Sequence, residues 1–279
     1  MCQNYRTISL ISHPSKVMLM IILNRLKPQA EQIISEEQTG FRAGRSTTEQ
    51  IFNLRMLCEK HLQHQSELYH VFIYFKKAFD RVWHAALWAT MHKFNINANL
   101  IEVIKNLYNR ATSAVLFNSK LGDWFKTTVV VRQGCLLSPI LFNLFLERIL
   151  TDVLENHVGT ISIGGRIITN LRFADDIDGL AGSEDELKEF TAKLENTAKA
   201  YGMEINAEKT KVMANRTLTN EILINWQKLE EVSTFKYLGA IISDEGSKPE
   251  ILARMAQTTA ALSKLKHLAK QETLPEIKD

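Results

Sequence analysis

The chain has 279 residues, of which 45% are hydrophobic and 23% charged, the composition of a globular protein with a substantial core. A formal net charge of +3 is too small to identify a nucleic-acid partner, and Cys2, Cys58 and Cys135 are too widely spaced for a disulfide framework or a zinc site. The longest apolar run, Val17 to Leu23, is far shorter than the ~20 residues of a membrane span, and the N-terminus lacks the layout of a signal peptide. We therefore expect an intracellular protein, in cytoplasm or nucleus, with no membrane segment.

The first third of the chain predicts two helices separated by a loop. Ser12-His13-Pro14 is typical of a helix start, and the apolar run that follows continues the helix to Leu26. The glycines and arginines of residues 38–45 predict a loop. Ser46-Thr47-Thr48-Glu49 has the spacing of a capping box and precedes apolar residues at helical intervals. The loop thus leads into a helix N-terminus, where backbone N–H groups favour anions.

The middle of the chain alternates between strands and helices. Aromatic and β-branched residues predict a strand over 69–75, and helical patterns follow near 84–94 and 99–110. Residues 113–118 and 125–131 are expected to pair as strands, and Ser138-Pro139 begins a helix that runs through Leu150. Two hairpins are predicted after it, one over 161–168 around Gly164-Gly165, and one over 171–177 with two acidic residues at its bend.

The last third predicts a helix, several short strands and a final helix. A capping box at Ser183–Glu186 begins the first helix, and Gly202 ends it. Short strands are expected near 203–206, 210–214, 222–226 and 233–242, before a helix from about Pro249 to Lys270. Antiparallel hairpins backed by helices indicate an α+β protein.

The acidic pair Asp175-Asp176 is the first candidate for chemistry. Adjacent carboxylates repel each other, and burying them is unfavourable unless a cation compensates. Their hard oxygen ligands suit Mg²⁺, which needs only one or two protein carboxylates besides water and substrate phosphates. An exposed turn is the alternative interpretation, but the flanking Phe173, Ala174 and Ile177 are more apolar than an exposed turn requires.

Phe173-Ala174-Asp175-Asp176 resembles the signature of reverse transcriptases, and further segments resemble that family in the same order along the chain. They are residues 4–10 and 40–46 (fingers motifs), 132–139 (template and nucleotide contacts), 202–211 (palm) and 235–239 (primer grip). The amino-acid sequences of these motifs most resemble those of reverse transcriptases from non-LTR (LINE-type) retrotransposons. One such motif would be a weak signal, whereas six in order, over residues 4 to about 270, are specific.

The resemblance implies a right-hand polymerase fold with an antiparallel palm sheet, an acidic hairpin and helices packed on one face of the sheet. Fingers are expected over 1–70, a palm with inserted fingers elements over 71–245, and the incomplete start of a thumb or connection over 246–279. The implied activity is RNA-directed DNA synthesis with two Mg²⁺ ions, on an RNA template with a DNA primer and deoxynucleoside triphosphates.

The resemblance also implies roles for single residues. Asp175 would be the main metal ligand, supported by Asp176, and Lys209 would donate a proton to pyrophosphate. The remaining expected contacts are Arg42 and Arg45 with the triphosphate, Phe79 with the sugar, Gln133 and Gly134 with nucleotide and template, and the primer grip at Tyr237, Leu238 and Gly239. Each residue also has an ordinary structural interpretation, as a surface loop pair for the arginines or a core aromatic for Phe79.

One residue departs from the family pattern at a critical place. The family's first motif begins with an aspartate four residues before the alanine of its Ala-Phe pair; here that alanine is Ala78, and Tyr74 stands four residues before it. A neutral, bulky phenol supplies no charge, so we expect the site to bind Mg²⁺ poorly. Asp80 already has its own place in the motif. Asp178, two residues after Asp176, would share its face of a strand and is the alternative replacement.

Four hypotheses follow. The leading one is a reverse transcriptase domain of retrotransposon origin that Tyr74 has impaired. The second is an active RNA-directed DNA polymerase that tolerates Tyr74, through Asp178 or an altered metal geometry. The third is a nucleic-acid-binding remnant without chemistry, whose basic clusters would bind in a salt-dependent manner. The fourth is an expressed relic with no selected role.

Overall fold

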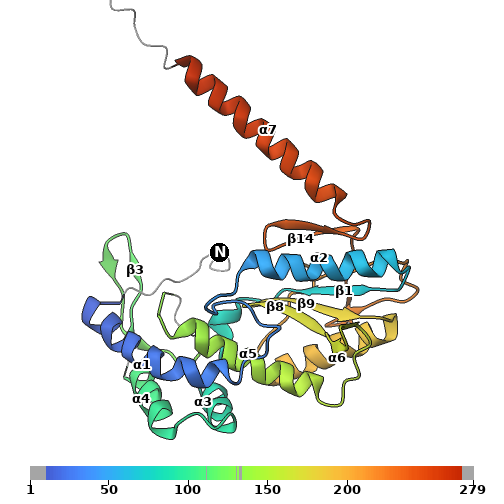
Figure 1. Ribbon diagram of the computed structural model, residues 1–279. Coiled ribbons are helices and arrows are strands. Elements are labelled where there is room, and N and C mark those ends of the chain that lie inside the picture. The colour runs from blue at the N-terminus through green and yellow to red at the C-terminus, as the bar shows by residue number, and fades with distance from the viewer. Residues whose placement is uncertain (1–10, 111, 130, 132–133, 272–279) are drawn as a thin grey trace, which may run out of the picture.

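The computed structural model describes residues 11–271 except 111, 130, 132 and 133 (Figure 1). Its centre is a five-stranded sheet in the order β13-β10-β1-β9-β8, in which β1, β8, β9 and β10 pair antiparallel and β13 pairs parallel to β10. The strands are β1 (Tyr69–Ile73), β8 (Asn170–Phe173), β9 (Asp176–Ala181), β10 (Lys211–Ala214) and β13 (Glu230–Glu231). Every residue of β1 is buried, because both faces of the sheet are covered.

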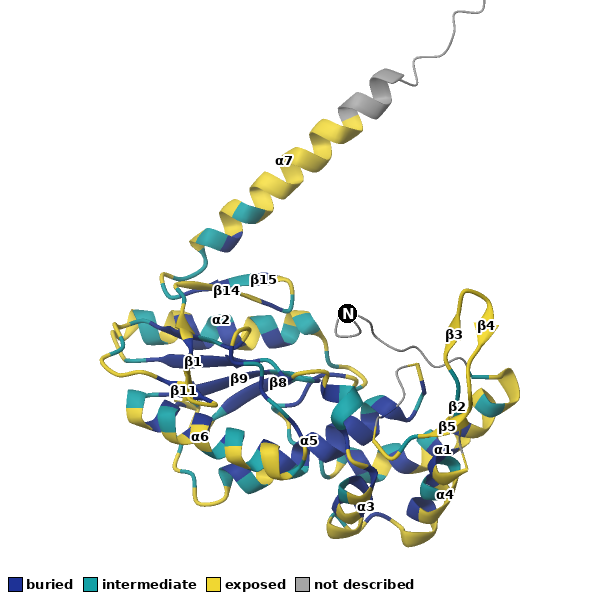
Figure 2. Ribbon diagram, turned by 180° about the vertical axis from the view of Figure 1, so that it is seen from behind, coloured by how far each residue is buried: buried dark blue, intermediate teal, exposed yellow. Residues whose placement is uncertain are grey.

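The two faces of the sheet pack against different elements. On one face, α5 (Ser138–Leu154) and α6 (Glu184–Ala200) cover a core that includes Val71. On the other, α2 (Thr47–Gln63) and the hairpin of β14 (Thr234–Tyr237) and β15 (Ala240–Ser243) cover a core around Phe72 (Figure 2). Successive side chains of a strand point to opposite faces, so neighbours such as Val71 and Phe72 belong to different cores. The α+β fold is confirmed, but helices lie on both faces of the sheet, not on one.

A helical part lies beside the sheet and shares α5 with it. Here α1 (His13–Glu31) and α3 (His84–Lys93) pack against α5, and α4 (Ala98–Asn109) packs against α1 and α3 (Figure 1). The Ser12 hydroxyl caps α1 by accepting a hydrogen bond from the Ser15 N–H at 3.4 Å, as the sequence predicted. The helix continues beyond Leu26 because Leu26 and Ala30 are both buried in the core.

Short hairpins and one long helix complete the described part of the chain. A 3₁₀ turn, Ala78–Arg81, connects β1 to α3. The pairs are β2 (Thr112–Ser113) with β5 (Phe125–Lys126), β3 (Leu116–Phe117) with β4 (Lys120–Leu121), β6 (Ser162–Ile163) with β7 (Arg166–Ile167), and β11 (Leu223–Ile224) with β12 (Gln227–Lys228). Helix α7 (Lys248–Gln271) projects away from the body (Figure 2). None of the helices within the described residues is both long and apolar enough to cross a membrane.

Several of the predicted strands differ in the structure. The segment 113–118 is divided between β2, which pairs with β5, and β3, which pairs with β4. Residues 203–206 form no strand, and Ile205 makes only an isolated bridge to Phe75. The segments 222–226 and 233–242 each run into the turn of a hairpin, because left-handed residues reverse the chain after β11 and β14. These residues are Asn225 and Trp226 in the first turn, and Leu238 and Gly239 in the second.

Candidate active site

A cleft of about 680 Å³ opens where β1 ends and β9 begins. Ile73 of β1 pairs with Ile177 of β9, so the next residues along the two antiparallel strands, Tyr74 and Asp176, lie side by side. The residues that line the cleft include Phe41, Tyr74, Lys77, Phe79, Asp80, Gly134, Asp175 and Asp176. The fold therefore brings together Asp175, Asp176, Phe79, Gly134 and Tyr74, which lie far apart in the sequence.

The acidic pair sits on a tight turn between β8 and β9. Phe173 pairs with Asp176, which leaves Ala174 and Asp175 as the two residues of the turn. Ala174 has a φ of 57°, in the left-handed region that non-glycine residues rarely occupy. Burial and then the neighbouring Asp175 raise the pKa of Asp176 to about 6, because both disfavour a second negative charge there.

Tyr74 is held by the segment that contains Lys209. The Tyr74 N–H donates to the Thr210 hydroxyl at 3.2 Å, and its carbonyl accepts from the Asn206 N–H at 2.7 Å. The Lys209 ammonium lies 4.7 Å from the centre of the Tyr74 ring, within reach of a cation–π interaction. Lys209, expected as a proton donor to pyrophosphate, thus contacts the residue that is predicted to replace a carboxylate.

The residues present do not fit a pair of Mg²⁺ ions. Two Mg²⁺ ions about 4 Å apart require ligands that they share. Within the described residues, no group of three or more His, Cys, Asp or Glu side chains could hold a metal ion. The turn supplies two carboxylates, and the neighbouring position on β1 supplies the phenol of Tyr74.

Asp178 is bound elsewhere and does not line the cleft. It is fully buried, and its Oδ2 lies 3.0 Å from Nδ1 of His70, whose Nε2 lies 3.7 Å from the Cys58 sulfur. Burial alone would lower the pKa of His70, but Asp178 and then Cys58 outweigh it and raise that pKa to about 10. The Asp178 carboxyl group is therefore engaged by the buried His70 side chain, which argues against its acting as a replacement metal ligand in the cleft.

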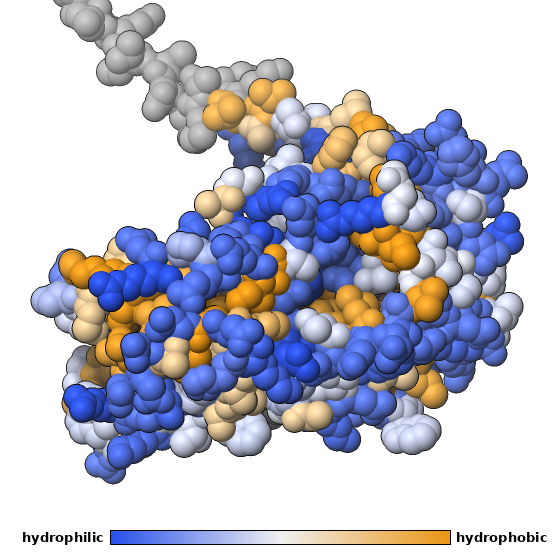
Figure 3. Space-filling model, turned by 60° about the horizontal axis from the view of Figure 1, so that its bottom comes forward, coloured by the Kyte–Doolittle hydropathy of each residue, from blue (hydrophilic) through white to orange (hydrophobic). Residues whose placement is uncertain are grey.

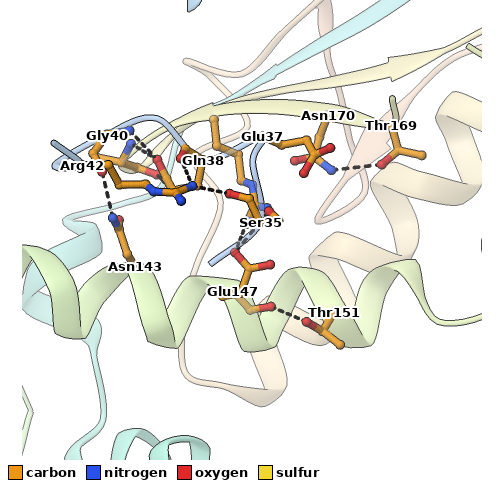
Figure 4. Close-up of polar contacts among 12 residues, drawn as sticks. Ser35, Glu37, Gln38, Gly40, Arg42, Asn143, Glu147, Thr151, Thr169 and Asn170 are labelled. Carbon is orange, nitrogen blue, oxygen red and sulfur yellow. Dashed lines mark hydrogen bonds and ion pairs between the residues drawn. The ribbon is translucent and has the colours of Figure 1, made fainter. Parts of the chain in front are cut away.

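The two predicted triphosphate arginines are not cleft residues. Arg42 donates to the carbonyls of Ser35 at 2.7 Å and Gln38 at 3.0 Å (Figure 4). It also donates to the Glu31 carboxylate at 3.0 Å. Arg45 donates to Glu49 at 2.7 Å. Each guanidinium is held by a nearby carboxylate and neither lines the cleft, so the structure does not show the expected arrangement.

The expected primer grip forms the end of the β14–β15 hairpin. Tyr237 is buried against Phe72, with ring centroids 6.0 Å apart, and Leu238 and Gly239 make the turn with φ values of 48° and 88°. Burial, followed by Asp178 and Asp176, raises the pKa of Tyr237 well above its ordinary value. The hairpin thus reaches the acidic residues from the α2 face of the sheet.

Some expected positions lie outside the described residues, and some cleft residues were not predicted. Gln133 and the motif over 4–10 belong to the first group. Phe41 belongs to the second, because it lines the cleft and packs edge-on against Phe79 at 6.2 Å. Phe79 also stacks on Phe142 of α5 at 4.4 Å, so it is both part of the core and part of the cleft wall. The sequence feature that could have indicated Phe41 as a cleft residue is its position beside Gly40 in the loop motif over 40–46.

Similar proteins place this arrangement in a known family. The family model described as "Reverse transcriptase (RNA-dependent DNA polymerase)" matches residues 2–242. The RNA-directed DNA polymerase from mobile element jockey of Drosophila funebris is 28% identical over 253 residues, which are 86% of this chain and 27% of that protein. The probable RNA-directed DNA polymerase from transposon X-element of Drosophila melanogaster is 27% identical over 252 residues, 86% of this chain and 26% of that protein. The chain therefore spans about a quarter of the length of these relatives.

Solved structures share the fold at lower identity. Apo telomerase from Candida tropicalis, truncated from its C-terminal domain, aligns with a TM-score of 0.57 and 19% identity over 82% of this chain and 43% of that chain. Telomerase from Candida albicans in complex with the TWJ fragment of telomeric RNA aligns with a TM-score of 0.55 and 12% identity, over 82% of this chain and 36% of that chain. The sheet, the acidic turn and the family match over most of the chain lead to one conclusion: the chain belongs to the reverse transcriptase (RNA-dependent DNA polymerase) family and resembles the members found in non-LTR mobile elements.

Proposed function

We propose that this reverse transcriptase domain binds a primer–template and a deoxynucleoside triphosphate in the cleft but transfers nucleotides poorly, because Tyr74 stands beside Asp176 where a carboxylate is needed. The side-by-side position of Tyr74 and Asp176 carries the proposal. A phenol there adds no negative charge and occupies more volume than a carboxylate. Divalent metal ions that align the attacking hydroxyl and the leaving pyrophosphate would therefore bind weakly or out of place.

Other cleft residues suit nucleotide binding. Phe79 is wedged between Phe41 and Phe142, which makes it a rigid wall for the sugar of a nucleotide. Gly134, with no side chain, leaves room for the base and the template, and Lys77 lines the same cleft. We assign the fingers to 1–70, the palm with inserted fingers elements to 71–245, and the start of a thumb or connection to 246–279. Within this division, α2 extends from the first part over the sheet of the second.

The test is primer extension on an RNA template with a DNA primer and Mg²⁺. We expect Tyr74→Asp to extend the primer at least about 100-fold faster than the unmodified chain, the scale of a lost charge-stabilising group at an active site. Tyr74→Asn, with the size of Asp but no charge, is the matched control and is expected to stay inactive. Activity of Tyr74→Asn equal to that of Tyr74→Asp would show that bulk, and not charge, is the lesion.

Two further outcomes separate the remaining hypotheses. If the unmodified chain extends the primer about as fast as Tyr74→Asp does, the proposal is contradicted and an active polymerase that tolerates Tyr74 is favoured. If the folded variants are all inactive but bind the primer–template, then Tyr74 is not the sole lesion, and a nucleic-acid-binding domain without chemistry is favoured.

A further inference from the structure

A buried glutamine outside the predicted site residues contacts the acidic turn. Gln38 is fully buried, and its backbone runs beside β8, where it forms a parallel bridge with Arg172. The Thr39 N–H donates to the Arg172 carbonyl at 2.9 Å, and the Arg172 N–H donates to the Glu37 carbonyl at 2.9 Å. The loop that precedes α2 therefore extends the edge of the sheet up to the acidic turn.

The Gln38 carboxamide binds both polar backbone groups of one turn residue. Its Oε1 accepts from the N–H groups of Ala174 at 2.8 Å and Gly40 at 2.9 Å, and its Nε2 donates to the Ala174 carbonyl at 3.1 Å. Two N–H donors at one atom require that atom to be the oxygen, which determines the orientation of the amide. A single side chain thus pairs with Ala174 as a neighbouring strand would.

Gly40 is confined from two sides. A Cβ on Gly40 would lie 2.2 Å from the Ala174 nitrogen, so no side chain fits between the loop and the turn. The Gly40 carbonyl accepts a hydrogen bond from Nδ2 of the buried Asn143 of α5 at 2.8 Å (Figure 4). Helix α5, the loop and the turn are therefore connected through Asn143, Gly40 and Gln38.

The residue that Gln38 binds has an unusual backbone conformation and adjoins the two carboxylates. Ala174 immediately precedes Asp175-Asp176, and its φ of 57° is unfavourable for a residue with a Cβ. Such a conformation persists only where surrounding contacts hold it. We propose that Gln38 is a positioning residue, whose carboxamide holds Ala174 in the left-handed conformation and so directs Asp175 and Asp176 into the cleft. The proposal rests on the proposed function only for the use of that cleft.

The first test measures the bonds without requiring activity. Amide hydrogen exchange, followed by NMR at Ala174 and Gly40, is compared between the unmodified chain, Gln38→Leu and the matched control Gln50→Leu. Gln50 is equally buried and donates to the carbonyls of Glu37 and Arg172 at 3.2 Å, without a bond to the turn. We expect Gln38→Leu to lower protection of both amides about tenfold or more, and Gln50→Leu to lower it less.

The second test asks whether the carboxylates move. The ¹³C carboxyl shifts of Asp175 and Asp176 are expected to change in Gln38→Leu and to remain close to those of the unmodified chain in Gln50→Leu. In the Tyr74→Asp background, Gln38→Leu is expected to lower kcat about tenfold or more with little change in KM for the primer–template. Unchanged exchange at Ala174, or carboxyl shifts that match those of the control, would overturn the proposal.

A conservative variant keeps the test decisive if Gln38→Leu fails to fold. In Gln38→Glu, a protonated carboxyl can still donate to the Ala174 carbonyl, whereas an ionised one places a second acceptor against it. Protection of Ala174 should therefore be near normal at low pH and fall as the new carboxyl ionises. If the protection of the Ala174 amide in Gln38→Glu does not change with pH, the proposed role of Gln38 is contradicted. An inactive Tyr74→Asp protein would contradict the proposed function alone, because hydrogen exchange and carboxyl shifts still decide the role of Gln38.

Discussion

At the scale of single residues, the cleft is shaped by how charge is placed on the ends of two strands. The fold places Asp175 and Asp176 on one tight turn and puts the phenol of Tyr74, with the Lys209 ammonium over its ring, on the neighbouring strand. The ends of the two strands thus offer Asp175 and Asp176 as acidic groups, while Tyr74 at the end of β1 offers a neutral phenol. Burial, followed by the neighbouring Asp175, raises the pKa of Asp176 as a consequence.

Asp176 is predicted to make stability depend on pH. Burial and Asp175 raise its pKa from 3.8 to about 6 in the folded chain, so the folded state is more stable when the Asp176 carboxyl group is protonated. This contribution is fully present below about pH 4 and is lost as the pH rises through about 6. Asp176→Asn should therefore stabilise the chain at pH 7 by up to about 3 kcal/mol, and by less where water screens the charge.

Denaturant unfolding of both proteins at several pH values between 4 and 7 checks this prediction. The difference in the free energy of unfolding should grow as the pH rises, because only the unmodified chain acquires the unfavourable charge. A difference that stays constant over this range would show that Asp176 does not titrate as described.

At the scale of elements, buried polar pairs determine how the strands and helices meet. His70 of β1 binds Asp178 of β9 and reaches Cys58 of α2, which connects the two central strands to the helix above them. On the other face of the sheet, Arg172 of β8 pairs with Glu147 of α5 at 3.1 Å. These pairs join residues from different elements, so they specify the position of each element relative to its neighbours.

Removing one member of the His70–Asp178 pair is predicted to be costly. His70→Leu leaves the fully buried Asp178 side chain without its His70 partner, and losing one partner costs about 3–5 kcal/mol in comparable buried ion pairs. Cys58→Ala, which removes only the long sulfur contact, should cost less. The free energy of unfolding in denaturant measures both changes, and equal losses in the two variants would contradict the ion-pair interpretation.

At the scale of the whole molecule, a compact sheet-and-helix body carries surfaces that nothing in the described chain covers. Helix α7 exposes Ile251, Met255, Leu262 and Leu265 along its length. In Figure 3, apolar side chains also gather on the left, over the half that holds α1 and α4, where Val17, Ile21 and Val103 are exposed. Exposed apolar surface of this extent is typical of an interaction surface.

Binding of a primer–template is predicted to depend strongly on salt, although the net charge is only +3. Each phosphate that a basic side chain neutralises contributes about −0.9 to the slope of log affinity against log salt. We expect a slope of about −3 or steeper for an RNA–DNA duplex, measured by fluorescence anisotropy between 50 and 200 mM salt, a range over which such contacts weaken strongly. A flat salt dependence, or no binding by folded protein, would favour a relic without a nucleic-acid partner.

Local signals in the sequence were sufficient for much of the fold. The Ser46 and Ser183 hydroxyls cap α2 and α6 as the capping boxes predicted, and the aromatic run over 69–75 contains the central strand β1, which ends at Ile73. The acidic pair was placed correctly at a bend, because its apolar flanks and its turn are encoded within seven residues. Each of these features depends on contacts between near neighbours, so the sequence alone determines it.

The site required the tertiary structure, because its decisive contacts join residues far apart in the chain. Arg42 was expected at a triphosphate, yet its partner Glu31 lies in the preceding helix and holds it beside the loop. Asp178 was weighed as a replacement metal ligand, but His70, 108 residues earlier, binds it in the core. Gln38 gave no sign of its role until the fold placed its carboxamide against Ala174, 136 residues away. The sequence by itself determined the family and the helices, and it is the source of the prediction that Tyr74 replaces a carboxylate. Tertiary packing decided which polar groups face the cleft and which bind partners in the core, because a buried polar group binds whatever partner the fold brings within reach.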